Sequence, residues 1–248
     1  MSETARYLRF GDRALIVEFG NAISPEISAK VRGMYVAVLN SDLKGIRALL
    51  PTYRSLVVEY SPEQMRYGEM TDALQALETN LGTMDLPEPN LLIVPTLYGG
   101  EGGPDMQTVV EKSGLSEQDV IAVHSGTDYL IYMLGFTPGF PYLGGMDARL
   151  ETPRLASPRV KIPGGSVGIA GKQTGMYSMD SPGGWQLIGH TPIKVYDPLR
   201  AEPILYRAGD YIRFAPIDRA EYDKISAAVA DGTYQYQIAP VKGGGKNV

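Results

Sequence analysis

The 248-residue sequence contains no cysteine and only two histidines, His124 and His190. The lack of cysteine excludes disulfides, thiolate nucleophiles and cysteine-based metal sites. A zinc site would have to be completed by carboxylates, so we expect no metal centre. There is no run of about 18 apolar residues, the length that a membrane-spanning helix needs. The first ten residues also lack the apolar stretch of a signal peptide, and we therefore expect a cytoplasmic protein.

An excess of positive charge is also missing. The formal net charge is −5, which argues against broad binding to nucleic acid or to anionic membranes. Hydrophobic residues make up 44% of the sequence, enough to form at least one ordinary core. Composition therefore predicts a globular protein with neither a nucleic-acid nor a membrane partner.

Strand-like and helix-like segments alternate over residues 1–86. Two short β-prone runs come first, followed by an amphipathic helix with Ser24 as its N-cap and Pro25 at its first position. Two further strands lead to a second helix, which we expect to begin at Ser61 with Gln64 at the capping-box position. This order of elements predicts a ferredoxin-like α+β domain.

The acidic segment Asp85–Asn90 contains two prolines and is predicted to be a linker. The amino-acid composition changes after it. The stretch Gly135–His190 interleaves glycine and proline with short β-prone pieces. Many short strands with such turns indicate a barrel or a sandwich. We predict a second, β-rich domain over residues 90–240 and a disordered tail over 241–248.

The loop Gly135–Gly145, "GFTPGFPYLGG", contains no charge although loops normally run over the polar surface. Glycine and proline at this density exclude a regular helix or a central strand. Its aromatic residues Phe136, Phe140 and Tyr142 give it an apolar face. Composition alone establishes only that this loop is unusual.

Arg159 and Lys161 are two residues apart, so a strand would project both from the same face. Two cations beside a glycine-rich turn suit a carboxylate or a phosphate. A solvated strand face explains the pair equally well. The turn Gly164–Gly175 does not match a phosphate-binding P-loop, because Lys172 is followed by glutamine instead of serine or threonine.

His190 lies at the end of a β-prone piece, and its ordinary pKa suits an acid or base near neutral pH. His124 ends a predicted helix that Ser116 caps, where it can interact with the helix dipole. Both histidines are also explained by ordinary hydrogen bonding. Trp185, the single tryptophan, follows a tight Ser-Pro-Gly-Gly turn and is expected to pack or to line a pocket.

The loop "GFTPGFPYLGG" and the later stretch "PRLASPRVKIPGGSVGIAGKQTGMYSMDSPGGWQLIGHTP" together resemble the family of the bacterial 5-oxoprolinase B subunit. Its members are also called allophanate hydrolase subunit 1 or Kip-type inhibitors of a sporulation histidine kinase. The motif-rich match runs from about His124 to Pro198. The resemblance implies an α+β fold with an N-terminal ferredoxin-like domain and a C-terminal cyclophilin-like β-barrel, related to a carboxyltransferase domain.

The resemblance also implies an activity. Together with the A and C subunits of 5-oxoprolinase, the chain is expected to cleave 5-oxo-L-proline to L-glutamate with hydrolysis of ATP. No ATP motif is recognisable here, which favours a nucleotide site at the junction with the C subunit. The same resemblance leaves a non-catalytic alternative, inhibition of a sensor histidine kinase. Prolyl isomerase activity is a third possibility that rests on fold analogy alone.

Residue roles are then hypotheses placed on the matching motif. Arg159 and Lys161 bind the substrate carboxylate or the transferring phosphate, and His124 or His190 relays a proton. Backbone N–H groups near Gly164–Gly168 donate where negative charge develops. The expected substrate- or partner-binding residues are Phe136, Pro138, Gly139, Phe140, Tyr142, Gly164, Gly165, Ser166, Gln173, Ser181 and Trp185.

Overall fold

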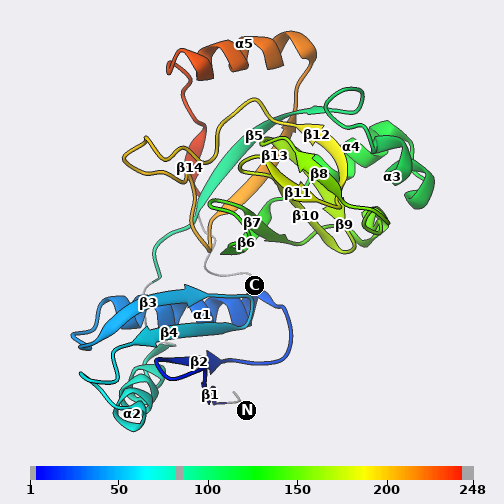
Figure 1. Cartoon of the computed structure of the whole chain (residues 1–248). Helices are drawn as coiled ribbons and strands as arrows, with labels where there is room; N and C mark the ends of the chain where they lie inside the picture. Colours follow the sequence, from blue (N-terminus) through cyan, green and yellow to red (C-terminus); the bar gives the residue numbers. More distant parts are fainter. Residues whose placement is uncertain (1–3, 82–85, 242–248) are drawn as a thin grey trace. The chain divides into compact units, whose positions relative to one another are not determined.

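The computed structural model describes residues 4–81 and 86–241 (Figure 1). Contacts divide the chain into two compact units, one running to Glu88 and the other beginning at Pro89. This division falls inside the predicted linker, of which Asp85 lies outside the described residues. The predicted tail also lies outside them beyond Val241, so the exact domain bounds stay predictions.

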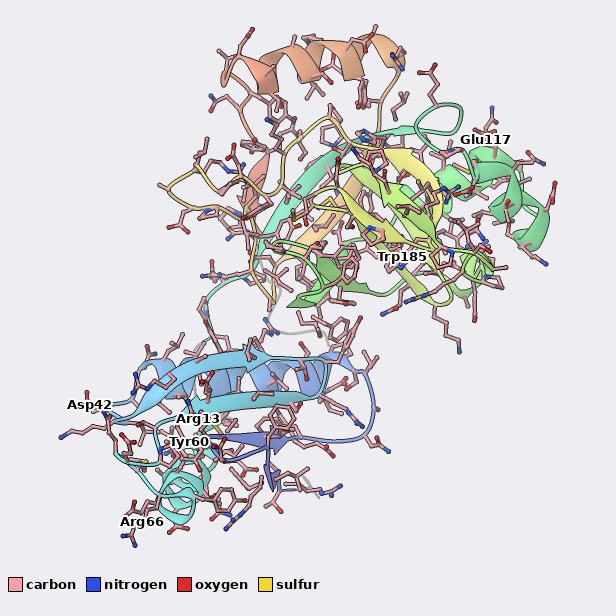
Figure 2. The ribbon with its side chains drawn as sticks, viewed as in Figure 1. Arg13, Asp42, Tyr60, Arg66, Glu117 and Trp185 are labelled. Carbon is pink, nitrogen blue, oxygen red and sulfur yellow. The ribbon has the colours of Figure 1, made fainter. Side chains whose placement is uncertain are left out.

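The first unit is one antiparallel sheet with two helices. Its elements are β1 (Arg6–Arg9), β2 (Ala14–Glu18), α1 (Pro25–Leu39), β3 (Ile46–Pro51), β4 (Ser55–Tyr60) and α2 (Tyr67–Glu78). The strand order is β1-β2-β4-β3. Inward-facing residues of β2 and β4 alternate with outward-facing ones and pack with α1 and α2 in one core. Arg13 and Tyr60 lie at the same end of this sheet (Figure 2).

The order ββαββα differs from the βαββαβ order of a ferredoxin-like unit. Here the edge strand β1 comes from the N-terminal hairpin, and within the described residues no strand of this sheet follows α2. The α+β class is confirmed, whereas the ferredoxin-like assignment stays a prediction.

Helix α1 begins as predicted, because the Ser24 side chain accepts a hydrogen bond from the Ile27 N–H at 3.2 Å and Pro25 occupies the first turn. The predicted start of the second helix at Ser61 was wrong. The Ser61 carbonyl closes a single turn by accepting from Gln64 and Met65, and α2 begins only at Tyr67. Its capping box is formed by Glu69, which accepts from the Arg66 N–H at 2.7 Å.

The second unit is built on a strongly curved sheet. Its elements are β5 (Asn90–Tyr98), α3 (Met106–Ser113), α4 (Glu117–Ser125), β6 (Tyr129–Leu134), β7 (Pro141–Gly144), the short 3₁₀ turn Ala148–Leu150, β8 (Arg159–Ile162), β9 (Ser166–Ala170), β10 (Gln173–Met176), β11 (Ser181–Gly183), β12 (Gln186–His190), β13 (Tyr211–Pro216), α5 (Arg219–Ala230) and β14 (Ile238–Pro240). The strand order is β10-β9-β12-β5-β13-β6-β7, with β14 added to β5. The terminal strands β7 and β10 lie against each other, so the sheet is a nearly closed barrel. This confirms the predicted barrel.

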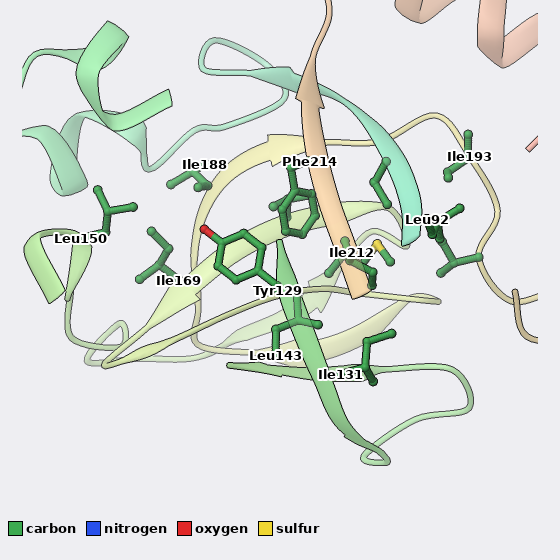
Figure 3. Packing of buried hydrophobic residues seen from close by; sticks show 14 of the residues in the cluster. Leu92, Tyr129, Ile131, Leu143, Leu150, Ile169, Ile188, Ile193, Ile212 and Phe214 are labelled. Carbon is green, nitrogen blue, oxygen red and sulfur yellow. The ribbon is translucent and has the colours of Figure 1, made fainter. Parts of the chain in front are cut away.

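The barrel interior holds the main core of the second unit. Tyr129 and Phe214 lie side by side there with ring centroids 5.7 Å apart (Figure 3). Aliphatic side chains from β5, β9 and β12 surround them. Strands β8 and β11 form a separate two-stranded ribbon, and it is this ribbon that carries the predicted cations.

Candidate functional site

Phe140 is the centre of an aromatic cluster. Its ring makes edge-to-face contacts with Phe136, Tyr142, Tyr177 and Trp185 at centroid distances of 5.2–5.5 Å. Pro141 begins the short terminal strand β7, a position that proline tolerates. Phe140 and Trp185 are buried, and with Tyr177, Ile162, Ala170 and Leu187 they form a small second core. The structure thus brings together the four aromatic residues expected to bind the substrate or a partner, Phe136, Phe140, Tyr142 and Trp185.

Phe136 is held in an unusual position at the edge of this cluster. Its φ of 62° lies in the left-handed region, where a bulky side chain is disfavoured, yet 62% of the residue is exposed. Pro138 beside it is also exposed. Gly139 is fixed by the Tyr206 hydroxyl, which donates to the Gly139 carbonyl at 2.6 Å. A strained, exposed aromatic residue on an anchored loop is a common sign of a functional contact.

Arg159 is partly buried and bound to the chain itself. Its guanidinium donates to Asp105 at 2.7 Å and to the Trp185 carbonyl at 3.3 Å. The other Asp105 oxygen accepts from the Leu187 N–H at 2.7 Å. Arg159 therefore ties β8 to Asp105 at the start of α3 and to the residue that precedes β12.

Lys161 forms an exposed ion pair with Asp180 at 2.7 Å. The same carboxylate accepts from the Gly164 N–H at 2.9 Å. These contacts lower the pKa of Asp180, with the Lys161 hydrogen bond as the largest cause, and the Asp180 carboxylate raises the pKa of Lys161. One carboxylate is thus held by a lysine and a backbone amide at the point where the sequence predicts that a substrate carboxylate binds.

The neighbouring backbone donors are also engaged. The Gly165 N–H donates to the Tyr177 carbonyl at 2.7 Å, and the Ser166 N–H donates to the Pro163 carbonyl at 3.2 Å. Gly165 has a φ of 92°, and a Cβ there would lie 2.6 Å from the Thr191 carbonyl oxygen, so glycine is required. This turn is consequently no ready-made cradle for a triphosphate.

His190 faces the same turn. Its Nε2 lies 3.0 Å from the Gly164 carbonyl, which can only accept, so Nε2 carries the proton. Its Nδ1 then accepts from the Tyr222 hydroxyl of α5 at 2.8 Å. Burial lowers the pKa of His190, which favours the neutral ring. His190 is therefore the histidine closest to the predicted anion site.

His124 lies elsewhere, fully buried inside the barrel. Thr174 donates its hydroxyl proton to the Gly168 carbonyl at 3.1 Å, so it accepts from His124 Nε2 at 2.7 Å. Nδ1 then accepts from the Tyr98 hydroxyl at 2.7 Å. Burial lowers the pKa of His124 to about 3, and the ring is neutral at physiological pH.

Two buried polar atoms near the aromatic cluster have no hydrogen-bond partner among the described residues. They are the Ser181 Oγ, on β11, and the Gln186 Oε1, at the start of β12. The Gln186 amide nitrogen donates to the Pro153 carbonyl at 2.9 Å. Gln173 is half-buried at the start of β10. Within residues 4–81 and 86–241, no group of three or more histidine or acidic side chains is arranged to hold a metal ion.

The structure thus gathers Lys161, Gly164, Gly165 and His190 at one turn and separates His124 from them. Sequence reasoning missed Asp105, Asp180 and Tyr222, the partners of the predicted cations and of His190. No local pattern in the sequence marks any of the three.

Comparison with known proteins gives relatives at high identity. Residues 5–206 match the family described as carboxyltransferase domain, subdomain C and D. The chain is 45% identical to the B subunit of 5-oxoprolinase from Escherichia coli O157:H7 over 174 residues, 70% of this chain and 75% of that protein. It is 39% identical to the B subunit of 5-oxoprolinase from Bacillus subtilis over 232 residues, covering 88% of this chain and 96% of that protein.

Solved structures agree with this relationship. The protein TTHA0988 is 34% identical, with a TM-score of 0.74 over 83% of this chain, which spans only 40% of that longer protein. A conserved uncharacterised protein from Pyrococcus horikoshii is 42% identical over 88% of this chain and its own full length, with a TM-score of 0.52. The Kluyveromyces lactis urea amidolyase, 19% identical with a TM-score of 0.78, shares the fold over 96% of this chain and 16% of its own. The chain therefore belongs to the carboxyltransferase subdomain C and D family, among the proteins named as the B subunit of 5-oxoprolinase.

Proposed function

We propose that this chain is the B subunit of an ATP-dependent 5-oxoprolinase that cleaves 5-oxo-L-proline to L-glutamate together with the A and C subunits. The observation that carries the proposal is the 39–45% identity to proteins named as the B subunit of 5-oxoprolinase. The kinase-inhibitor alternative has no comparable support in these names.

The proposed reaction explains the need for ATP. A five-membered lactam is a resonance-stabilised amide that water attacks poorly. Transfer of a phosphoryl group to the amide oxygen makes the carbonyl carbon electrophilic. Water then adds to that carbon, the ring C–N bond breaks and the ring nitrogen takes up a proton, which leaves an acyl phosphate. A second water hydrolyses the acyl phosphate to the carboxylate of L-glutamate and inorganic phosphate.

Lys161 and the Gly164 N–H are the groups that we assign to the substrate carboxylate. They hold the Asp180 carboxylate in this structure, so their geometry is already suited to a carboxylate ligand. Asp180 acts as a placeholder that the substrate displaces. Because all three groups are near the surface, the exchange leaves no buried charge without a partner.

The ATP site is proposed to lie at the junction with the C subunit. The backbone donors of the Gly164–Ser166 turn are occupied by Asp180, Tyr177 and Pro163, so this turn does not fit a triphosphate. The exposed Phe136 is the proposed contact for that partner, because an exposed aromatic residue on a rigid loop supplies binding energy at low entropic cost.

The decisive assay is ATP-dependent release of glutamate from 5-oxoproline by the purified A and C subunits, with and without this chain. We expect activity only when all three proteins are present. Undiminished turnover in the absence of this chain would refute the proposal.

The carboxylate assignment is tested in the same assay. Lys161→Ala should raise KM for 5-oxoproline about tenfold or more with a smaller effect on kcat, because a charge-assisted contact is lost. Asp180→Asn should lower KM by no more than about fivefold, because the exposed ion pair that the substrate displaces is weak. The matched control is Lys172→Ala, which removes an exposed lysine from the turn between β9 and β10. This variant should change neither KM nor kcat. An unchanged KM in Lys161→Ala would overturn the assignment while leaving the subunit role intact.

A further inference from the structure

The N-terminal unit contains a polar cleft that the proposed reaction does not use. It has a volume of about 380 Å³ and is lined by Arg13, Arg47, Glu59, Tyr60, Ser61, Pro62 and Glu63. Volumes of this order are typical of sites for small molecules. The cleft lies at the end of the sheet where Arg13 and Tyr60 are found (Figure 2).

The hollow is a consequence of the strand register. Glu59 is on the central strand β4, and its direct partners are Ala14 on β2 and Ala48 on β3. Two alanines beside a long side chain leave open space over that part of the sheet. The register shifts between Ile46 and Ala48, so Arg47 is the extra residue of a β-bulge. Bulges redirect a side chain, and here the bulged residue lines the cleft.

The end of the cleft is closed by the turn that follows β4. The Ser61 N–H donates to the Gly45 carbonyl at 2.8 Å, and the Tyr60 N–H donates to the Arg13 carbonyl at 2.9 Å. These backbone bonds fix the turn against the starts of β2 and β3. The walls are therefore held by the sheet and not by mobile side chains alone.

Charged groups of both signs line the cleft without neutralising each other. Among the described residues, Arg47, Glu59 and Glu63 form no ion pair within 4.0 Å, and Arg13 only approaches the exposed Asp12 at 3.9 Å. A second cleft of the same sheet differs, because its Arg6 is paired with its Glu18 at 3.5 Å. Of these two clefts, only the first therefore has guanidinium groups as well as carboxylates that are available to an incoming molecule.

We propose that this cleft binds a free acidic amino acid, a zwitterion with a second carboxylate. Arg13 and Arg47 provide one guanidinium for each carboxylate, and guanidinium forks match carboxylates in shape and charge. Glu59 accepts from the ammonium group. The proposal follows from the charges of the cleft and does not rest on the proposed function.

Binding is measured on the full chain alone by isothermal titration calorimetry, with L-glutamate as the probe. We expect saturable binding at millimolar or lower concentration, with L-glutamine and glutarate weaker because each lacks one charged group. Arg47→Ala should weaken binding of L-glutamate about tenfold or more, since the charge-assisted hydrogen bonds to one carboxylate are lost. Arg6→Ala, an exposed arginine of the same unit, is the matched control and should have no effect.

The ammonium contact has its own test. Glu59→Gln should weaken L-glutamate but not glutarate, which has no ammonium group. Absence of saturable L-glutamate binding would overturn the proposal, as would binding of inorganic phosphate or glutarate at least as tight as that of L-glutamate. None of these results depends on 5-oxoprolinase turnover, so failure here is distinguishable from failure of the proposed function.

Discussion

His124 illustrates how a polar residue is accommodated inside the barrel. Both ring nitrogens are hydrogen-bonded, to Tyr98 and Thr174, and the ring packs 4.8 Å from that of Phe214. This network is satisfied only by the neutral tautomer with its proton on Nε2. Protonation would place an unpaired charge in the core, which is why burial lowers the pKa of His124 to about 3.

A stability measurement follows from this pKa. Between about pH 6.5 and pH 3 the unfolded chain binds a proton at this histidine that the folded chain does not bind. The free energy of unfolding should therefore fall as the pH is lowered, by about 1.4 kcal/mol per pH unit from His124 alone. We expect urea unfolding at pH 7, 6 and 5 to show this loss.

His124→Gln is the comparison, because glutamine does not titrate. The variant should be less stable at pH 7, yet its stability should decline less steeply with acid than that of the wild type. His190→Gln should remove a smaller part of the slope, in the same direction, because burial also lowers the pKa of His190. Equal slopes in the wild type and His124→Gln would contradict the neutral buried histidine.

At this scale the sequence predicts residue types better than residue roles. Arg159 and Lys161 look alike as a pair in a strand, but the structure gives them different partners and different burial. Their partners, Asp105 and Asp180, come from distant parts of the chain. Whether a cation is held by a partly buried partner or by an exposed one depends on the tertiary structure, and the spacing of residues in the sequence does not show it.

At the scale of the elements, the start of helix α3 is held in place by hydrogen bonds to other parts of the second unit. Asp105 precedes the helix but makes no side-chain cap bond to it. Its carboxylate is used instead by Arg159 on β8 and by the Leu187 N–H on β12. One side chain thus fixes the start of α3 against two strands of the barrel region.

Removing that attachment should be costly. Asp105→Ala leaves a partly buried guanidinium and a backbone N–H without their acceptor, so we expect a loss of about 2–3 kcal/mol in the free energy of unfolding. Asp180→Ala breaks an ion pair of the same length whose two side chains are 57–69% exposed, so its loss of stability should be clearly smaller than that of Asp105→Ala. Chemical denaturation of both variants checks the difference, and equal losses would show that Asp105 has no special role.

The elements that were predicted correctly have local causes. Ser24 and Ser116 cap their helices through bonds to residues three positions on, and these bonds are visible in the sequence as patterns. Ser61 carries the same Ser-Pro-Glu pattern as Ser24, yet its carbonyl closes only one turn before the chain redirects. A cap pattern predicts a helical turn, whereas the length of the helix depends on how the residues after that turn pack.

At the scale of the whole molecule, the glycine- and proline-rich composition of Gly135–His190 predicted a barrel or a sandwich, and the family resemblance favoured the barrel. The composition was not sufficient to predict that the terminal strands β7 and β10 meet, because closure depends on contacts between distant segments. Within the described part of the chain, no helix is both long and apolar enough to cross a membrane.

The two units have separate hydrophobic cores, and this separation can be tested by dividing the chain. A fragment beginning at Pro89 keeps every strand of the barrel, so we expect it to unfold cooperatively in a thermal scan. A fragment beginning at Gly100 loses β5, which pairs with β12, β13 and β14. Without that strand the sheet is interrupted at its centre and the buried Leu92 and Val94 are missing from the core, so this shorter fragment should show no cooperative transition. If the fragment from Pro89 also fails to fold, the second unit is not an independent folding domain. The two units would then be compact regions of one cooperative fold.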